Sequence, residues 1–490
     1  MATKYSFLFG ILFSFSISSF AQDGTLDLSF GNDGYVVTNI TNNSDVIYQI
    51  EETNNNNLLV VGNVNESTNL DLVISKYLTN GAVDLSFGTN GLVYPSYNTA
   101  SFGKRKLLVL PDNSFYLLGS ENEDFLIAKH FLNGDLDNSF GVNGFTTTDV
   151  DADYFQTAVL QEDGKIIAIG RTDDVNNYYQ IMMVRYLPNG DLDPTFGTNG
   201  ITLYDTDGEF FRIRKVLLQN DGKILLQQAE YSISPKKISI YRFMPNGNID
   251  NSFGDNGKII VMEDTSLTGG SMVLKPDGKI IATASNIDIG LTKIIQYLPD
   301  GTVDATFADN GERIINLANF YTSEVFFKGN RIVIYGHLSE FEGTTLVLAR
   351  FTENGNIDTT FGSSGYRYSS AFQSNDVTIQ SDDKIVVAGS TYWYEGETDF
   401  VLARYENNFL ETNTPILNIF SVYPNPSKGI FNISHDFITS ETAYQISDIT
   451  GKIIQQGNIS GEQSQIDISQ FENGIYLFTS EGSTIRLIKH

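Results

Sequence analysis

The sequence predicts an all-β protein built from seven similar units, because one pattern recurs along the chain at a nearly constant spacing. The pattern is G-x-[LIV]-D-x-[ST]-F-[GA]-x-x-G, and successive copies start 57, 53, 56, 57, 54 and 54 residues apart. Each copy is followed by four short runs of apolar and β-branched residues separated by turns, which is the content of one propeller blade. We therefore expect a seven-bladed β-propeller, followed by a small Ig-like β-sandwich.

The chain begins with the features of a secretory signal peptide, which we place at residues 1–21. Lys4 precedes an apolar run from Tyr5 to Phe20, and Ala21 provides a small residue before an expected cut at Gln22. This run is short for a membrane span, and no later stretch is comparably long and apolar. We expect an exported protein with no transmembrane segment in the mature chain.

The repeats occupy residues 22–411, and the four runs of each unit are named strands a, b, c and d in chain order. In the third unit, strands b, c and d are expected at 157–160, 166–170 and 181–186. Asp163-Gly164 between b and c favours a two-residue hairpin. An open solenoid is the alternative fold, but it would need polar capping units, and the first and last units resemble the others.

The repeated motif has a structural interpretation. Its Asp is placed to accept backbone N–H bonds and close a turn, and its Phe can pack between neighbouring blades. The alternative is a ring of seven ligand-binding aspartates, although each motif offers only one acid. The Asp and Phe pairs are Asp27 and Phe30, Asp84 and Phe87, Asp137 and Phe140, Asp193 and Phe196, Asp250 and Phe253, Asp304 and Phe307, and Asp358 and Phe361.

Strand d carries a basic residue at the same position in six of the seven units. If strand d is the outer edge of each blade, these charges would discourage edge-to-edge pairing. An exposed ion pair with a nearby motif Asp is the alternative. The residues at this position are Lys76, Lys129, Arg185, Arg242, Gln296, Arg350 and Arg404.

The LDxSFGxxG core of these units resembles the delta-60 repeat family of bacterial proteins. The resemblance extends from Gly24 to about Glu411 and is carried by all seven copies, with Ala308 in place of one motif Gly. It implies a propeller-like β-repeat protein and no settled activity.

A different pattern begins after a linker at 412–420. It contains YPNP from Tyr423, D-x-x-G-K from Asp448, Gly474-Ile475-Tyr476 and a basic ending. Over residues 421–490 this combination resembles the type A sorting domain of the type IX (Por) secretion system of Bacteroidetes. The resemblance implies that these residues interact with the type IX machinery, and that the protein is secreted or held at the outer cell surface. A terminal β-sandwich that binds a ligand is the alternative.

Composition excludes several classes of function. The chain has 59 acidic and 31 basic residues, and a formal net charge of -28 argues against a nucleic-acid partner. It has no cysteine, so it can form neither a disulfide nor a thiolate zinc site. Its four histidines form no pair at metal-ligand spacing, and no catalytic motif is present. We therefore assign no catalytic residue.

The a–b and c–d loops should share one face of the propeller, and they vary from unit to unit, which is where binding residues are expected. Aromatic rings beside acids on this face can stack on sugars, and packing of the rings on neighbouring loops is the alternative. The candidate rings are Tyr178, Tyr179, Tyr392, Trp393 and Tyr394.

One a–b loop carries Asp149, Asp151 and Asp153 at alternate positions, where they could share a calcium ion. The segment lacks the Gly of an EF-hand, and calcium is the only cofactor that the sequence suggests.

We expect a monomeric, non-catalytic binding protein that presents its variable loops to a glycan or protein partner. The alternatives are a carbohydrate-active enzyme, a glycoside hydrolase or lyase with an acidic central pocket, and a structural component of the envelope. An enzyme should show two or more acids converging on one pocket.

Overall fold

The computed structural model describes residues 23–490 apart from 65–70, 96, 98–103, 122–123, 150–153, 174–178, 207–209, 232–233, 341–342, 393–396, 409–420, 435–441, 449–451, 460–462 and 481–482. The chain divides into two compact units, Met1–Asn408 and Phe409–His490. The expected signal peptide and the 412–420 linker lie outside the described residues. The regular elements of the described ranges are β-strands, and no helix there is long and apolar enough to cross a membrane.

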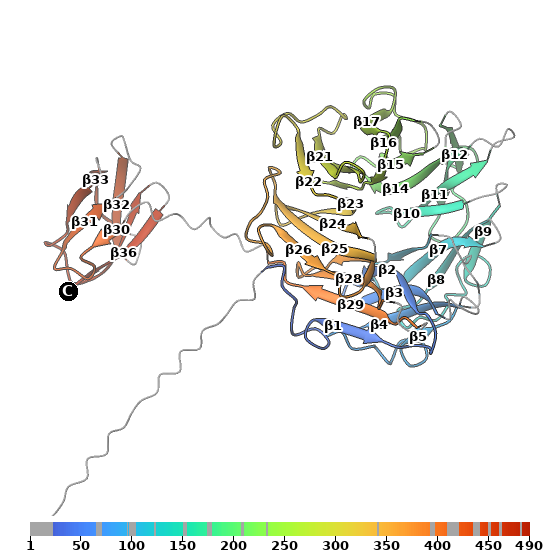
Figure 1. Cartoon of the computed structure of the whole chain (residues 1–490), viewed down its shortest axis with the longest axis horizontal. Helices are drawn as coiled ribbons and strands as arrows, with labels where there is room; N and C mark the ends of the chain where they lie inside the picture. The colour runs from blue at the N-terminus through green and yellow to red at the C-terminus, as the bar shows by residue number, and fades with distance from the viewer. Residues whose placement is uncertain are drawn as a thin grey trace, which may run out of the picture. The chain divides into compact units, whose positions relative to one another are not determined.

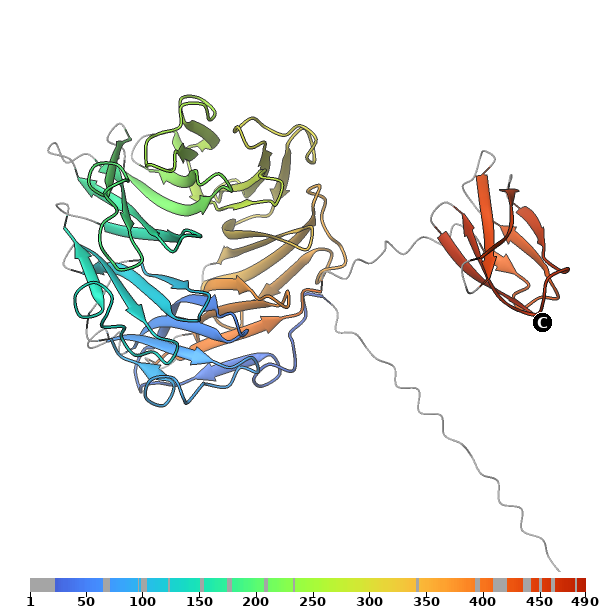
Figure 2. The same cartoon turned by 180° about the vertical axis from the view of Figure 1, so that it is seen from behind.

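The described residues of the first unit form seven antiparallel sheets that stand around a common centre as the blades of a propeller (Figures 1 and 2). The first three sheets are β2 (Val46–Glu52), β3 (Leu58–Val64), β4 (Asp71–Tyr77) and β5 (Leu92–Val93); β6 (Lys106–Val109), β7 (Phe115–Glu121), β8 (Asp124–His130) and β9 (Phe145–Thr148); and β10 (Tyr154–Leu160), β11 (Ile166–Asp173), β12 (Tyr179–Tyr186) and β13 (Ile201–Asp205).

The next two sheets are β14 (Phe211–Leu218), β15 (Ile224–Glu230), β16 (Lys236–Phe243) and β17 (Lys258–Asp264); and β18 (Leu267–Gly269) with β19 (Met272–Leu274), β20 (Ile280–Asn286), β21 (Leu291–Tyr297) and β22 (Glu312–Asn316). The last two are β23 (Phe320–Lys328), β24 (Arg331–Glu340), β25 (Gly343–Thr352) and β26 (Tyr366–Ser369); and β27 (Gln373–Ile379), β28 (Ile385–Ser390), β29 (Phe400–Tyr405) and β1 (Tyr35–Thr38).

The sheet order shows that strand d is not an edge strand, so the expectation of charged outer edges is wrong. Within each sheet the order is b, c, d and then strand a of the following unit. For example, β12 pairs with β11 on one side and with β13 on the other. Strand a therefore covers strand d, and five of the six basic side chains of strand d are buried, while Lys129 is half-buried.

The ring is closed by the N-terminal strand. The seventh unit has no following unit to supply an outer strand, and β1 fills that place by pairing with β29 from Tyr35↔Ala403 to Thr38↔Phe400. The last sheet is thus held together by both ends of the repeat region.

Each of the seven motif carboxylates contacts the backbone of its own turn and a side chain of strand d. In each motif Oδ1 accepts the N–H of the Ser or Thr two residues on, at 3.0 to 3.2 Å. In six motifs Oδ2 meets the strand d cation at 2.7 to 3.1 Å, and in the remaining motif Gln296 donates to Asp304. The ion pairs are buried, or half-buried at Lys129, rather than exposed, and they use the carboxylates that a ring of ligand-binding aspartates would need.

This contact changes the acidity of the motif carboxyls. Burial alone would raise the pKa of Asp193, but the Thr195 hydrogen bonds and the Arg185 guanidinium outweigh it and hold the pKa at about 2. Asp250 has the same value for the same reasons. Asp193 and Asp250 are therefore charged at neutral pH.

Each motif also touches the next one around the ring. The Gly141 N–H donates to the Asn189 carbonyl at 2.9 Å, and a Cβ on Gly190 would lie 3.0 Å from Phe140 Cζ. The same contacts join the last motif to the first, since the Gly362 N–H donates to the Asp23 carbonyl at 2.8 Å. Glycine is needed at 190 because φ is +94° and the Phe140 ring lies so close.

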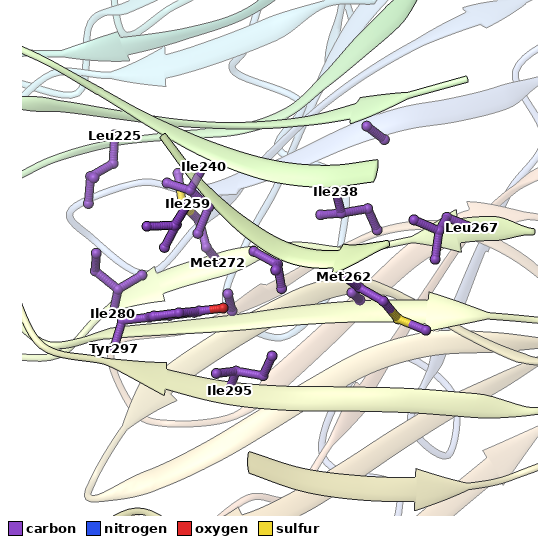
Figure 3. Packing of buried hydrophobic residues seen from close by; sticks show 14 of the residues in the cluster. Leu225, Ile238, Ile240, Ile259, Met262, Leu267, Met272, Ile280, Ile295 and Tyr297 are labelled. Atoms are coloured by element: carbon purple, nitrogen blue, oxygen red, sulfur yellow. The ribbon is translucent and has the colours of Figure 1, made fainter. Parts of the chain in front are cut away.

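The hydrophobic core lies between neighbouring sheets, because one face of every sheet packs on the preceding blade and the other face packs on the following blade. Figure 3 shows one such layer, in which Ile238 and Ile240 of β16 pack towards Met272, Ile280 and Ile295 of the following sheet. Burial of side chains of this size stabilises the fold by about 1.5–3 kcal/mol each.

The second unit consists of two sheets in the described residues. One is β30 (Ser421–Tyr423), β31 (Ile430–Ser434) and β34 (Gln463–Asp467), and the other is β33 (Ile453–Ile459), β32 (Thr442–Asp448), β35 (Gly474–Ser480) and β36 (Ser483–Lys489). They share one core, in which Phe431 and Ile466 of the first sheet contact the cluster of Ile446, Phe478 and Leu487.

Candidate functional site

The inner strands of the propeller enclose a cavity of about 720 Å³. Its wall comes from six b strands, namely β2, β6, β10, β14, β23 and β27, together with the two residues that precede β6. Cavities of this size hold drug-sized ligands in other proteins. Because the wall is made of paired strands rather than loops, its side chains are held in defined positions.

A β-bulge recurs at the corresponding position of five inner strands. The register of β2, β10, β14, β23 and β27 shifts by one residue there. A bulge bends its strand and redirects one side chain. The residues at the five bulges differ in chemical type, and they are Tyr48, Gln156, Arg214, Ser323 and Asn375.

The cavity wall is more basic than acidic, which differs from the acidic central pocket that the enzyme alternative assumed. Among the residues that the structure describes, five cationic side chains line it, against three carboxylates. The chain as a whole has a formal net charge of -28. The cations are Lys104, Arg105, Lys106, Arg214 and Lys215, and the carboxylates are Glu51, Glu324 and Asp376.

Two of the three carboxylates are paired within the wall. Lys106 Nζ lies 2.6 Å from Glu51 Oε1, and Lys215 Nζ lies 2.7 Å from Glu324 Oε2. The Ser271 hydroxyl also donates to Glu324 Oε2 at 3.0 Å. Each pair joins two different sheets, which helps to hold the wall together.

Asp376 is the third carboxyl, and its acidity is unusual. Its Oδ2 accepts the Ile50 N–H at 2.9 Å. Removal from water in the channel wall raises its pKa to about 7, and the nearby charges of Glu51 and Glu324 act in the same direction. The Lys106 charge opposes this shift and does not overcome it. Asp376 therefore changes its charge near neutral pH.

Lys104 and Arg214 are two of the cations of the wall. They also line an adjoining cavity of about 250 Å³ with Glu324, Asn375 and Asp376. Lys104 Nζ donates to the Ile213 carbonyl at 3.2 Å, and Arg214 donates to the Thr268 carbonyl at 2.9 Å and to the Tyr231 hydroxyl. Desolvation and the neighbouring Arg214 charge lower the pKa of Lys104 to about 8.

Two of the predicted aromatic residues can be located, and both contact neighbouring parts of the protein. The Tyr179 ring lies edge-on to Phe210 at 5.3 Å and beneath the Arg171 guanidinium at 4.6 Å. The Tyr392 hydroxyl donates to the Thr344 carbonyl at 2.9 Å. Neither residue lines the central cavity. Tyr178, Trp393 and Tyr394 lie outside the described residues.

The predicted calcium ligands remain a prediction. Asp149 lies just after β9, while Asp151 and Asp153 lie outside the described residues. No group of three or more candidate metal ligands is found in the part of the chain that the structure describes.

Two histidines are buried in the propeller, and their ring nitrogens are engaged within the protein. His130 Nε2 meets the Tyr97 hydroxyl at 2.5 Å, and its Nδ1 meets the Gly134 carbonyl at 2.9 Å. His337 Nε2 lies 2.9 Å from Ser374 Oγ and 3.1 Å from the Tyr335 hydroxyl. Burial lowers the pKa of both imidazoles, so they are neutral at physiological pH.

Comparison with known families matches both units. Residues 421–490 match the model described as "Secretion system C-terminal sorting domain". Residues 161–196, 275–307, 330–361 and 380–408 match "Domain of unknown function (DUF5122) beta-propeller". The protein is a β-propeller with a type IX sorting tail. The tail directs secretion to the cell surface, which confirms the predicted localisation and the two predicted resemblances.

Solved structures of similar fold have very different sequences. The polysaccharide lyase Uly1 is 12% identical with a TM-score of 0.46, and the match covers 79% of this chain and 93% of that one. Drosophila Semaphorin 2a is 8% identical with a TM-score of 0.46, and the match covers 96% of this chain and 99% of that one. The β-propeller domain of the Trilobed protease from Pyrococcus furiosus is 11% identical with a TM-score of 0.42, and the match covers 77% of this chain and 99% of that one. None of these carries an argument about what this chain binds, and no curated protein matches the chain.

The sequence reasoning missed the residues of the central cavity, although a signal for them was present. Lys104, Arg105 and Lys106 stand together in an acidic chain, as do Arg212, Arg214 and Lys215. The first group leads into β6 and the second lies within β14, which are strands b of their units. Because strand b is the inner strand, two basic groups there predict a basic channel wall.

Proposed function

We propose that the exported propeller is a non-catalytic binding protein, and that its ligand occupies the central cavity rather than the variable loops alone. The observation that carries this proposal is the cavity of about 720 Å³ on the inner strands, with charged and hydrogen-bonding side chains from six sheets. A site of this kind suits a glycan, whose hydroxyl groups need many polar partners.

The structure of the wall favours binding over catalysis. Glu51 and Glu324 are each held by a lysine at under 3 Å, so they serve the wall as ion-pair partners. The buried histidines contact groups of the protein and not the cavity. These contacts supply rigid positions for ligand groups.

One observation favours the enzyme alternative. Three carboxylates do converge on the cavity, and Asp376 has a pKa of about 7. A carboxyl group that titrates near neutral pH is suited to general acid or base catalysis. A glycoside hydrolase or lyase is therefore the second candidate function.

The test uses residues 22–490 on a panel of soluble and insoluble polysaccharides, with retention and released reducing ends measured in the same tubes. Retention without products is expected. The Thr157→Trp variant fills the cavity wall on β10 and should abolish retention. The Thr147→Trp variant on the outer strand β9 is the matched control, because Thr147 is exposed outside the cavity.

Other outcomes separate the alternatives. Released products that disappear in Asp376→Asn would establish the enzyme. Retention that survives Thr157→Trp but is lost in Trp393→Ala would return the site to the variable loops. Calcium and chelator arms of the same panel test the predicted metal site at Asp149.

A further inference from the structure

We propose that the cavity recognises an anionic sugar, such as a uronate or a sulfated residue at the end of a short glycan, through Lys104 and Arg214. This inference rests on the proposed binding function and adds the chemical class of the ligand.

The first argument is the local charge. Five cations and three carboxylates line the cavity, so the wall carries an excess of two positive charges when all eight groups are ionised. Such an excess is unexpected in a chain with a formal net charge of -28. Charges held close together in a confined channel repel each other, and they cost stability unless an opposite charge is nearby.

The second argument is how the charges are arranged. Lys106 and Lys215 have carboxylate partners at 2.6 and 2.7 Å. Lys104 and Arg214 instead donate hydrogen bonds to carbonyl and hydroxyl oxygens, which carry no full charge. Desolvation and, after it, repulsion by Arg214 lower the pKa of Lys104, and the nearby Glu324 charge, which is already paired with Lys215, does not overcome them. An oxyanion between them would relieve this repulsion and form charge-assisted hydrogen bonds.

The third argument concerns the rest of the lining. Thr157, Asn375 and Thr378 place polar side chains in the same cavity, and the Tyr48 ring is 40% exposed there. Hydroxyl and amide groups match sugar hydroxyls, and an exposed ring can stack on a sugar face. A simple anion such as phosphate would use the cations alone, whereas a sugar acid uses both sets of groups.

The fourth argument limits the length of the ligand. The acidic surplus of the chain lies outside this cavity, so a long polyanion would be repelled wherever it leaves the channel. A cavity of about 720 Å³ accommodates a few sugar units. We therefore expect the end of a chain or a short oligosaccharide, and not the interior of a polymer.

The experiment is isothermal titration calorimetry of residues 22–490 with tetragalacturonic acid and with neocarrabiose 4-O-sulfate, a sulfated disaccharide that has no carboxylate. The neutral controls are the methyl ester of the tetragalacturonate and unsulfated neocarrabiose. At least one acidic probe should bind, more weakly at 300 mM than at 50 mM salt, and its neutral counterpart should not. The two acidic probes distinguish a carboxylate from a sulfate ligand.

The variants locate the site. Lys104→Met and Arg214→Gln should each weaken binding of the acidic probe about tenfold to a hundredfold. Lys237→Met on β16 removes a cation that does not line the cavity, and it should bind as the wild type does. A thermal unfolding scan of each variant checks that the fold is intact.

Three results would overturn the inference. Equal binding of the acidic and neutral probes would show a neutral-glycan site, with the proposed binding function intact. Equal weakening by Lys237→Met would show a nonspecific charge effect. If no probe produces heat, the anionic-sugar inference fails, and the retention panel decides separately whether the protein binds another ligand.

Discussion

The repeated motifs of the propeller and its central cavity come from the same seven units, yet they differ in a consistent way. Every motif repeats the Asp and the Phe, the motif glycines recur except at Ala308, and in six units of seven the cation of strand d meets the next motif's carboxylate. In the channel the bulge positions carry Tyr48, Gln156, Arg214, Ser323 and Asn375. Contacts that hold the ring must be the same in each unit, whereas contacts to one ligand need to occur only once.

The largest effect should follow from breaking one repeated ion pair. Asp193→Ala would leave the buried Arg185 guanidinium without its carboxylate at 2.9 Å and remove the Thr195 turn bonds. Breaking a buried pair in this way typically costs about 3–5 kcal/mol. Urea unfolding at pH 7 measures the loss.

Asp191→Ala is the matched control, because Asp191 is exposed and two residues away. It should change stability by less than about 0.5 kcal/mol. If both variants lost the same amount, the repeated ion pair would not be a main support of the ring.

A smaller effect should follow from crowding one contact between motifs. Gly190→Ala places a methyl group 3.0 Å from Phe140 at a φ of +94°, and the combined strain should cost about 2 kcal/mol. Ala308→Gly is the opposite change, because Ala308 already stands at a φ of +41° where the other motifs have Gly. It should be neutral or stabilising by up to about 1 kcal/mol, and thermal unfolding of the two variants gives the comparison. Equal destabilisation by both substitutions would contradict the strain argument.

Substitution of Asp376 in the cavity wall should have the smallest effect on stability, and that effect should depend on pH. The folded pKa of Asp376 is about 7 and its ordinary value is 3.8, so the folded protein keeps the proton over that interval while the unfolded chain releases it. The contribution of Asp376 to stability is therefore fully present below about pH 4 and is lost as the pH rises through 7.

Asp376→Asn should remove this loss and stabilise the protein by about 1–2 kcal/mol at pH 8, with little change at pH 4. Urea unfolding at pH 4, 6 and 8 tests this. If the Asp376→Asn variant were less stable than the wild type at pH 8, the prediction would be wrong. Binding of an anionic sugar should also decline between pH 6 and 9 in the wild type, because Asp376 gains its charge and Lys104 loses its own. In Asp376→Asn only the Lys104 part of that decline should remain.

Part of the candidate site could be anticipated from local sequence, and part could not. The basic segments around Lys104 and Arg214 are visible in the sequence, and their place in strand b could be deduced from the repeat. Their proximity could not, because the two residues belong to the second and fourth units and are 110 positions apart. The acidity of Asp376 depends on burial and on charges from three other strands, for which no local pattern exists.

The sequence by itself determined the repeated unit, the turn closed by each motif Asp, the burial of each motif Phe and the sorting tail. These features depend on contacts within a few residues or on a period that any reader can count. Only the tertiary structure decided that strand a completes the preceding sheet, so that Arg185 and its counterparts are buried ion-pair partners and not charged edges. It also decided the charge of the channel, because closing the ring through β1 brings seven inner strands together, and electrostatic interaction depends on distance in space rather than along the chain.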